Sequence, residues 1–123
     1  PMALSRITLQ LARNPGLPGG DPERGYTLVA PLTPDAHIDV EAWRADRKSC
    51  RVVRFSPVDD EHATGLLTHR GDHWSFHYDE DDEGDDEAGY RLGEHVFKEG
   101  EYVTIASFSE DPLTYKVTDV SSL

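Results

Sequence analysis

The sequence predicts a mainly β protein: a small antiparallel β-barrel or sandwich of about eight short strands with one short helix. Apolar residues alternate with polar ones in several short segments, which is the period of a strand with one buried face. Gly, Pro, Asn and Asp separate these segments at short intervals, as in small barrels and sandwiches. The length of 123 residues suits one β-domain spanning residues 1–123.

The first half of the chain is predicted to hold three strands and the helix. The first strand is marked by the alternation of apolar and polar residues that begins at Ile7. In the helix, Asp35 or Asp39 is the expected N-cap, and Trp43 is expected to pack the helix onto the sheet. The expected elements are strands at residues 7–11, 26–32 and 50–55, a Pro- and Gly-rich loop at 14–24, and a helix at 35–48.

The second half is predicted to contain two hairpins. The first is expected to turn through a three-residue loop at 70–72. Its second strand carries an aromatic stripe that we assign to the core. The stripe and its neighbours on the facing strand are Trp74, Phe76, Tyr78, Leu66 and Thr68. The expected strands are residues 63–68 and 73–78, an extended stretch at 90–97, and a final pair at 102–108 and 113–120.

Negative charge is concentrated in one place. The formal net charge is −12, and eight of the 24 acidic residues lie in residues 79–87, which we call the acidic segment. So acidic a chain is expected to be repelled by nucleic acid and by anionic membranes. Basic partners and cations remain open.

The acidic segment is the leading candidate site. We expect an acidic surface loop at 79–88, and a non-enzymatic interaction module that presents this loop to a basic protein partner. The candidate binding residues are Asp79, Glu80, Asp81, Asp82, Glu83, Asp85, Asp86 and Glu87. The segment begins like an EF-hand loop, but its twelfth position is Tyr90 and a strand precedes it, which excludes an EF-hand. No cofactor is expected beyond weak binding of Ca²⁺, Mg²⁺, Mn²⁺ or Zn²⁺.

The alternative is a divalent-metal-binding protein or metal-dependent enzyme. With a loop at 70–72, His69 and His73 lie opposite each other and can share one ion with Asp72 and nearby carboxylates such as Asp79. His77 lies four residues from His73 along the strand, roughly 13 Å away, which is too far to join the same zinc ion. Solvated surface histidines are the competing interpretation.

Basic residues form their own group, which lies between residues 44 and 54. Its members are Arg44, Arg47, Lys48, Arg51 and Arg54. If this group lies beside the acidic segment, the segment can fold back onto it. If it faces away, the molecule is dipolar and a homo-oligomer can form head to tail.

The single cysteine, Cys50, rules out an internal disulfide and fits a reducing compartment. We expect it to be a buried structural thiol, and no serine lies in a nucleophile-elbow sequence. No signal peptide or membrane-length apolar run is present, so we expect a cytoplasmic protein. Pro1 precedes Met2 and is interpreted as a remnant of tag cleavage.

Five stretches together resemble a small bacterial family of conserved hypothetical proteins. They are residues 5–9 (SRITL), 42–44 (AWR), 74–79 (WSFHYD), 90–95 (YRLGEH) and 100–105 (GEYVTI). The resemblance implies no activity, cofactor or partner, and therefore assigns no site residue.

Overall fold

The fold is a single antiparallel sheet. The computed structural model describes residues 4–16, 18–56, 63–70, 73–78, 87–89, 95–105 and 113–122. Its elements are β1 (Leu4–Leu11), β2 (Asp21–Pro31), α1 (Val40–Ala45), the 3₁₀ helix η1 (Arg47–Ser49), β3 (Arg51–Phe55), β4 (Ala63–Arg70), β5 (His73–Tyr78), β6 (Glu87–Gly89), β7 (Tyr102–Ile105) and β8 (Leu113–Ser122).

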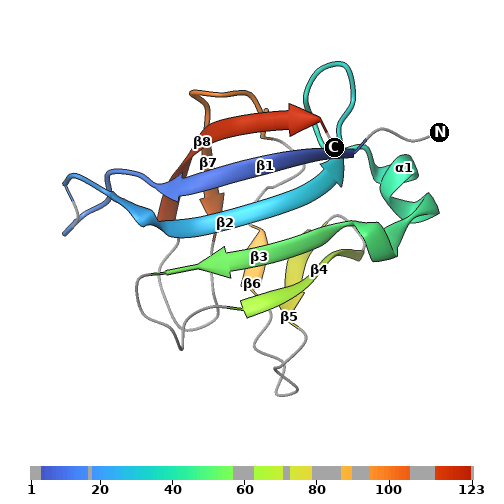
Figure 1. Cartoon of the computed structure of the whole chain (residues 1–123), viewed down its shortest axis with the longest axis horizontal. Helices are drawn as coiled ribbons and strands as arrows, with labels where there is room; N and C mark the ends of the chain where they lie inside the picture. The colour runs from blue at the N-terminus through green and yellow to red at the C-terminus, as the bar shows by residue number, and fades with distance from the viewer. Residues whose placement is uncertain are drawn as a thin grey trace.

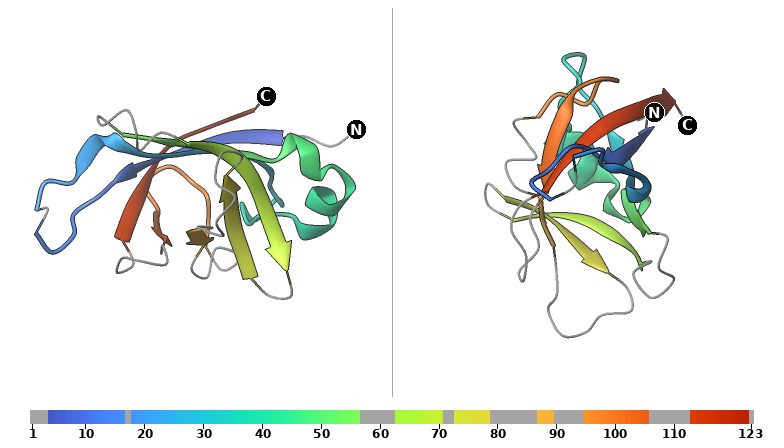
Figure 2. Two further views of the ribbon diagram at one scale, coloured as in Figure 1. Left: turned by 90° about the horizontal axis from the view of Figure 1, so that it is seen from below. Right: turned by 90° about the vertical axis from the view of Figure 1, so that its left-hand side faces the viewer.

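The eight strands follow the order β6-β5-β4-β3-β2-β1-β8-β7, and every neighbouring pair is antiparallel. Figure 1 shows the central strands side by side, with α1 at one end of the sheet. Seen from below in Figure 2, the sheet bends into an arch, and its two edge strands, β6 and β7, approach each other. The predicted mainly β, barrel-like class with one short helix is therefore confirmed.

The core fills the inside of this arch. Buried side chains alternate with less buried ones along β1 and much of β2, and one cross-strand row (Ile7, Leu28, Val52) has no exposed surface. Segments outside the strands add Ile38, Trp43, Cys50 and Phe97. Because the sheet curls, the two halves of its inner face pack against each other and one sheet encloses the core.

The predicted helix is shorter than expected and starts later. Asp39, not Asp35, is its N-cap, and the Asp39 carboxylate accepts a hydrogen bond of 3.1 Å from the Ala42 backbone N–H. Further backbone bonds hold the chain before it; among them, the Asp39 N–H donates to Pro31 O, and the Ala36 carbonyl accepts from the Phe97 N–H. None of the helices in the described residues has the length and hydropathy to cross a bilayer.

Trp43 fastens this short helix to the sheet, as predicted. Its ring is buried, and its Nε1–H donates a hydrogen bond of 2.9 Å to the Leu67 carbonyl of β4. The rings of Trp74 and His69 pack edge-on against it, with centroids 5.4 and 5.7 Å away. The Arg47 guanidinium lies over the Trp43 ring, 5.0 Å from its centroid.

The observed strands differ from the predicted ones mainly at the ends that adjoin the connecting loops. The strand β2 begins at Asp21, inside the stretch predicted as a loop, and residues 95–97 belong to no strand although 90–97 was expected to be extended. The rest of the predicted extended stretch, residues 90–94, and the end of the predicted strand at 102–108 lie outside the described part of the chain, which omits 106–112. The final pair is confirmed as β7 and β8.

The register of β4 and β5 is shifted by one residue from the prediction. Arg70 pairs with His73, so two residues separate the strands, not the predicted three. Leu67 therefore lies opposite Phe76 and is buried, whereas Leu66 is only half-buried. A shift of one residue in the register moves the side chains of a strand to the opposite face of the sheet. The observed register is favoured because it buries Leu67 beside Phe76.

The long β1–β2 hairpin depends on close backbone contact at Gly25. A Cβ at this position would overlap the Leu9 carbonyl oxygen and lie 3.0 Å from Cζ of Phe55. The strand register shifts next to this point, between Gln10 and Leu11, which bends the hairpin. Only a residue without a side chain allows the two strands to approach in this way.

We expect Gly25→Ala to lower the free energy of unfolding by about 2 kcal/mol or more, because the new methyl group overlaps backbone that cannot move aside. The matched control is Gly19→Ala, since a Cβ there has no atom within 4 Å. Urea denaturation measures both. Equal stability of the two variants would show that the strands do not approach so closely.

For Trp43→Phe we expect a loss of about 1–3 kcal/mol, because the buried Leu67 carbonyl loses its donor while the aromatic packing is largely kept. Chemical denaturation followed by far-UV circular dichroism is the measurement. Tyr102→Phe, at an exposed ring, serves as control and is expected to change stability by less than about 0.5 kcal/mol. A Trp43→Phe variant as stable as wild type contradicts the role of this hydrogen bond.

Candidate functional site

The acidic segment lies almost entirely outside the described residues. Of its carboxylate residues only Glu87 is described, as the first residue of β6, where its backbone pairs with Phe76. The predicted loop at 79–88 is therefore too long at its C-terminal end, because the chain is already a strand at Glu87. The other seven acids, from Asp79 to Asp86, occur in the chain between β5 and β6, and β6 is an edge strand.

The predicted pairing of His69 with His73 is wrong. His69 lies opposite Trp74, and His73 lies opposite Arg70, so the two histidines belong to adjacent cross-strand rows. Adjacent rows alternate between the two faces of a sheet. Asp72 and the side chain of His73 are outside the described residues, so metal binding itself stays an untested prediction.

His69 instead belongs to the aromatic cluster beneath α1. Its imidazole is half-buried, with its centroid 4.4 Å from that of Trp74. This packing joins β4, β5 and the helix, and gives His69 a structural part in the fold. Within the ranges that the structure describes, no three His, Cys, Asp or Glu side chains gather as a metal site.

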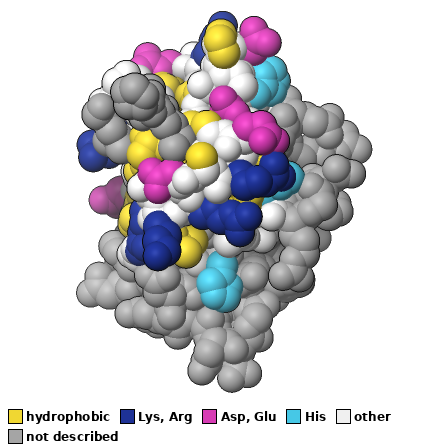
Figure 3. Space-filling model, turned by 90° about the vertical axis from the view of Figure 1, so that its right-hand side faces the viewer, with side chains coloured by type: hydrophobic (Ala, Val, Ile, Leu, Met, Phe, Trp, Pro, Cys, Tyr) yellow, Lys and Arg dark blue, Asp and Glu magenta, His cyan; other side chains and the backbone are white. Residues whose placement is uncertain are grey.

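Side chains of the predicted basic group make separate local contacts. Arg44 forms an exposed ion pair of 2.8 Å with Glu41, and Arg47 covers the Trp43 ring. Figure 3 shows Lys and Arg side chains gathered at this end of the molecule, with Asp and Glu side chains among them. Whether the acidic segment meets this group stays a prediction, because the segment is outside the described residues.

Cys50 is a buried thiol, as expected. Its side chain has no exposed surface, and its Sγ–H donates to the Asp46 carbonyl at 3.5 Å. Burial, together with the Asp46 carboxylate, raises the pKa of the Cys50 thiol from 9.0 to about 11. The thiolate, which is the reactive form, is therefore disfavoured at neutral pH.

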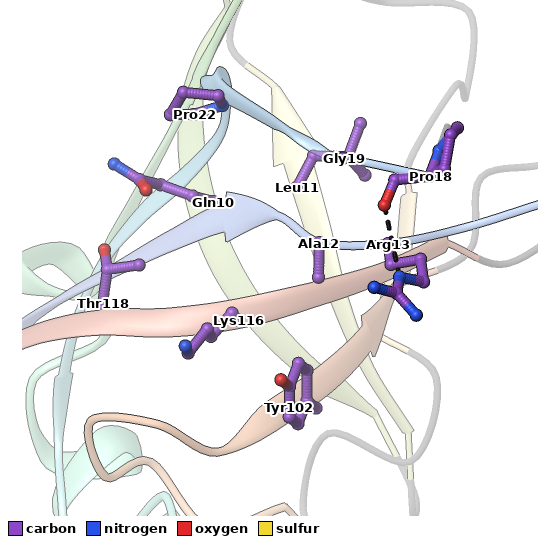
Figure 4. A pocket seen from close by; sticks show the side chains of 10 residues that line it. All are labelled: Gln10, Leu11, Ala12, Arg13, Pro18, Gly19, Pro22, Tyr102, Lys116 and Thr118. Carbon is purple, nitrogen blue, oxygen red and sulfur yellow. Dashed lines mark hydrogen bonds between the residues drawn. The ribbon is translucent and has the colours of Figure 1, made fainter. Parts of the chain in front are cut away.

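A groove that sequence reasoning did not predict crosses the outer face of the sheet. It has a volume of about 820 Å³, and the β1–β2 hairpin forms one wall (Figure 4). Its floor follows one cross-strand row, in which Lys116 of β8 lies between Gln10 of β1 and Tyr102 of β7. The lining residues are Gln10, Leu11, Ala12, Arg13, Pro18, Gly19, Pro22, Tyr102, Lys116 and Thr118.

The groove is cationic although the chain is strongly acidic. Arg13 and Lys116 line it, and none of the lining residues that the structure describes is acidic. The Arg13 Nε–H donates to the Pro18 carbonyl at 3.2 Å, which leaves its two terminal amino groups for other partners. Lys116 forms no ion pair within the described part of the chain.

Sequence reasoning missed this groove for a clear reason. Gln10 and Lys116 stand at opposite ends of the chain, and only the pairing of β1 with β8 makes them neighbours. The sequence predicts only a Pro- and Gly-rich loop at residues 14–24. The available signal was weak: an outward-facing cation beside an outward-facing tyrosine becomes visible only once the strand register is known.

We expect iodoacetamide at pH 8 to alkylate Cys50 at least about a hundredfold more slowly in the folded protein than in the urea-denatured chain. Raising the thiol pKa by about two units lowers its thiolate fraction by that factor, and burial slows access further. The folded pKa is raised, so the contribution of this group to stability is complete below pH 9 and is lost as the pH rises toward 11. Native and denatured rates within tenfold of each other would contradict this account.

Comparison with known protein families, with curated proteins and with solved structures finds no match for this chain. The resemblance to a bacterial family of conserved hypothetical proteins therefore stays an expectation. Function is argued from the residues and their geometry.

Proposed function

We propose that the protein is a non-enzymatic binding module whose acidic segment binds a basic protein partner. The observation that supports this most strongly is the presence of eight carboxylates in nine consecutive positions. Such a density of one charge produces a local potential that attracts cationic surfaces and accelerates their encounter.

The sheet supports this proposal by the way it holds the ends of the segment. The strand before it, β5, carries the buried Trp74 and Phe76, so it is fixed by the core. The strand after it, β6, pairs with β5 through three residue pairs from Trp74 to Phe76. Both flanks of the acidic segment are therefore anchored at one edge of a rigid sheet.

The metal-binding alternative has lost its geometric motivation. It required His69 and His73 to face each other, and the register places them in different rows. The half-buried position of His69 between two tryptophans further favours a packing role for this residue. We therefore propose protein binding and not metal chemistry.

We further propose that the protein works in the cytoplasm. Its single cysteine is free and buried, and its stability depends on no disulfide. A basic partner in the same reducing compartment fits the charge of the segment.

The test compares two variants with the same net charge. One neutralises four acids of the segment (Asp79→Asn, Asp81→Asn, Glu83→Gln, Asp85→Asn), and the other neutralises four exposed acids elsewhere (Glu23→Gln, Asp35→Asn, Glu41→Gln, Glu101→Gln). Fluorescence anisotropy with a labelled oligolysine peptide reports binding. We expect the segment variant to bind about tenfold or more weakly and the control less than about threefold, with both losses shrinking as salt is added.

Two results would contradict the proposal. Equal weakening in both variants would show that overall charge and not the segment attracts the peptide. Absence of any binding by the wild-type protein at low salt would remove the acidic segment as a binding site. Because the control variant keeps the segment intact, the experiment separates these two outcomes.

A further inference from the structure

We propose that the groove formed by the β1–β2 hairpin and the outer face of β8 and β7 binds a small organic anion that carries a planar ring. None of the described residues that line the groove belongs to the acidic segment, and their charge is opposite to that of the segment. The inference therefore stands independently of the proposed function, and it rests on the charge, shape and rigidity of the groove.

The charge of the groove selects an anion. Among its described lining residues, the two ionic side chains, Arg13 and Lys116, are both cationic. The described carboxylates next to it in sequence do not line it: Asp21, before Pro22, accepts a hydrogen bond from the Glu23 N–H, and Glu101 lies directly before the start of β7. A guanidinium and an ammonium offer the charge-assisted donors that carboxylates and phosphates prefer.

The remaining lining selects a ring. Tyr102 is 56% exposed, which is unusual for an aromatic side chain on a strand of this small protein. The rings of Pro18 and Pro22 belong to the opposite wall, so a flat apolar group can lie between Tyr102 and the hairpin. The amide of Gln10, which makes no hydrogen bond within the described residues, offers a further donor and acceptor.

The size and charge of the molecule favour a small ligand over a polymer. A volume of about 820 Å³ falls in the range of about 300–1,000 Å³ found for small-molecule sites. A nucleic acid or an acidic protein would meet the net charge of −12 over a large area and be repelled. A small anion meets only the local cations.

The hairpin wall is held in place by a buried side chain, Asn14, which is 7% exposed. Its amide nitrogen donates to the carbonyls of Ala12 and Thr114, and its amide oxygen accepts from the Thr114 N–H at 2.9 Å. The Ala12 N–H also donates to Thr114 O. These bonds tie the hairpin to β8, so the groove is formed before a ligand arrives, which lowers the entropic cost of binding.

The experiment titrates the ¹⁵N-labelled full chain with four probes and follows backbone amide shifts. Phenyl phosphate and phenylacetate carry both a ring and a charge, inorganic phosphate carries only the charge, and benzyl alcohol only the ring. We expect saturable shifts around Gln10, Tyr102 and Lys116 with one or both of the first two probes, at least about threefold tighter than with either of the others. The stronger of the two anionic probes identifies the phosphate or carboxylate source.

Three variants assign the site. Lys116→Met and Tyr102→Leu change exposed side chains, and we expect them to weaken binding about tenfold and about threefold. The control Lys48→Met removes an exposed cation from η1, outside the groove, and is expected to leave the dissociation constant unchanged. Unshifted amide spectra away from the substitutions verify that each variant is folded.

Any of three results would overturn the proposal. The first is the absence of saturable binding by any anionic probe. The second is equal weakening by Lys116→Met and Lys48→Met, which indicates non-specific attraction. The third is that neither phenyl phosphate nor phenylacetate binds more tightly than inorganic phosphate, which removes the part assigned to Tyr102.

Discussion

Burial of one face of a single curled sheet is the constraint on which the rest of this structure depends. Ile7, Leu28 and Val52 form a fully buried row across β1, β2 and β3, and the same face continues to Phe76 and Val117. The curl lets this face pack against itself, so the small domain needs no second layer. Trp43 closes one end, where its indole N–H bonds to β4 and its ring meets Trp74 and His69.

The core is formed by the inner face of the sheet, so we expect binding sites on the outer face and in the segments that connect the strands. The acidic segment occurs between β5 and β6, at one edge of the sheet order, whereas the cationic groove lies on β1, β8 and β7 toward the other. The two features have opposite charge, and none of the described residues that line the groove belongs to the acidic segment. Cys50 is buried in the core, and the half-buried His69 packs against Trp74, so both side chains have a structural part.

Much of the fold could be predicted from the sequence, because alternation of apolar residues reports directly which side chains are buried. It located the strand at Ile7, the core role of Trp43 and the aromatic stripe at Trp74 and Phe76. The register of β4 and β5 could not be predicted, since two- and three-residue turns both suit the sequence and only burial of Leu67 distinguishes them. The groove was beyond prediction because its row joins strands from both ends of the chain.

The central claim is that one core supports two separate binding features of opposite charge. The most direct test records amide spectra of one sample to which the tighter-binding of phenyl phosphate and phenylacetate is added to saturation, followed by oligolysine peptide. The account predicts two sets of shifted amides that do not overlap, with the first set unchanged by the second addition. Displacement of the first probe by the peptide, or the same amides moving with both, would contradict it.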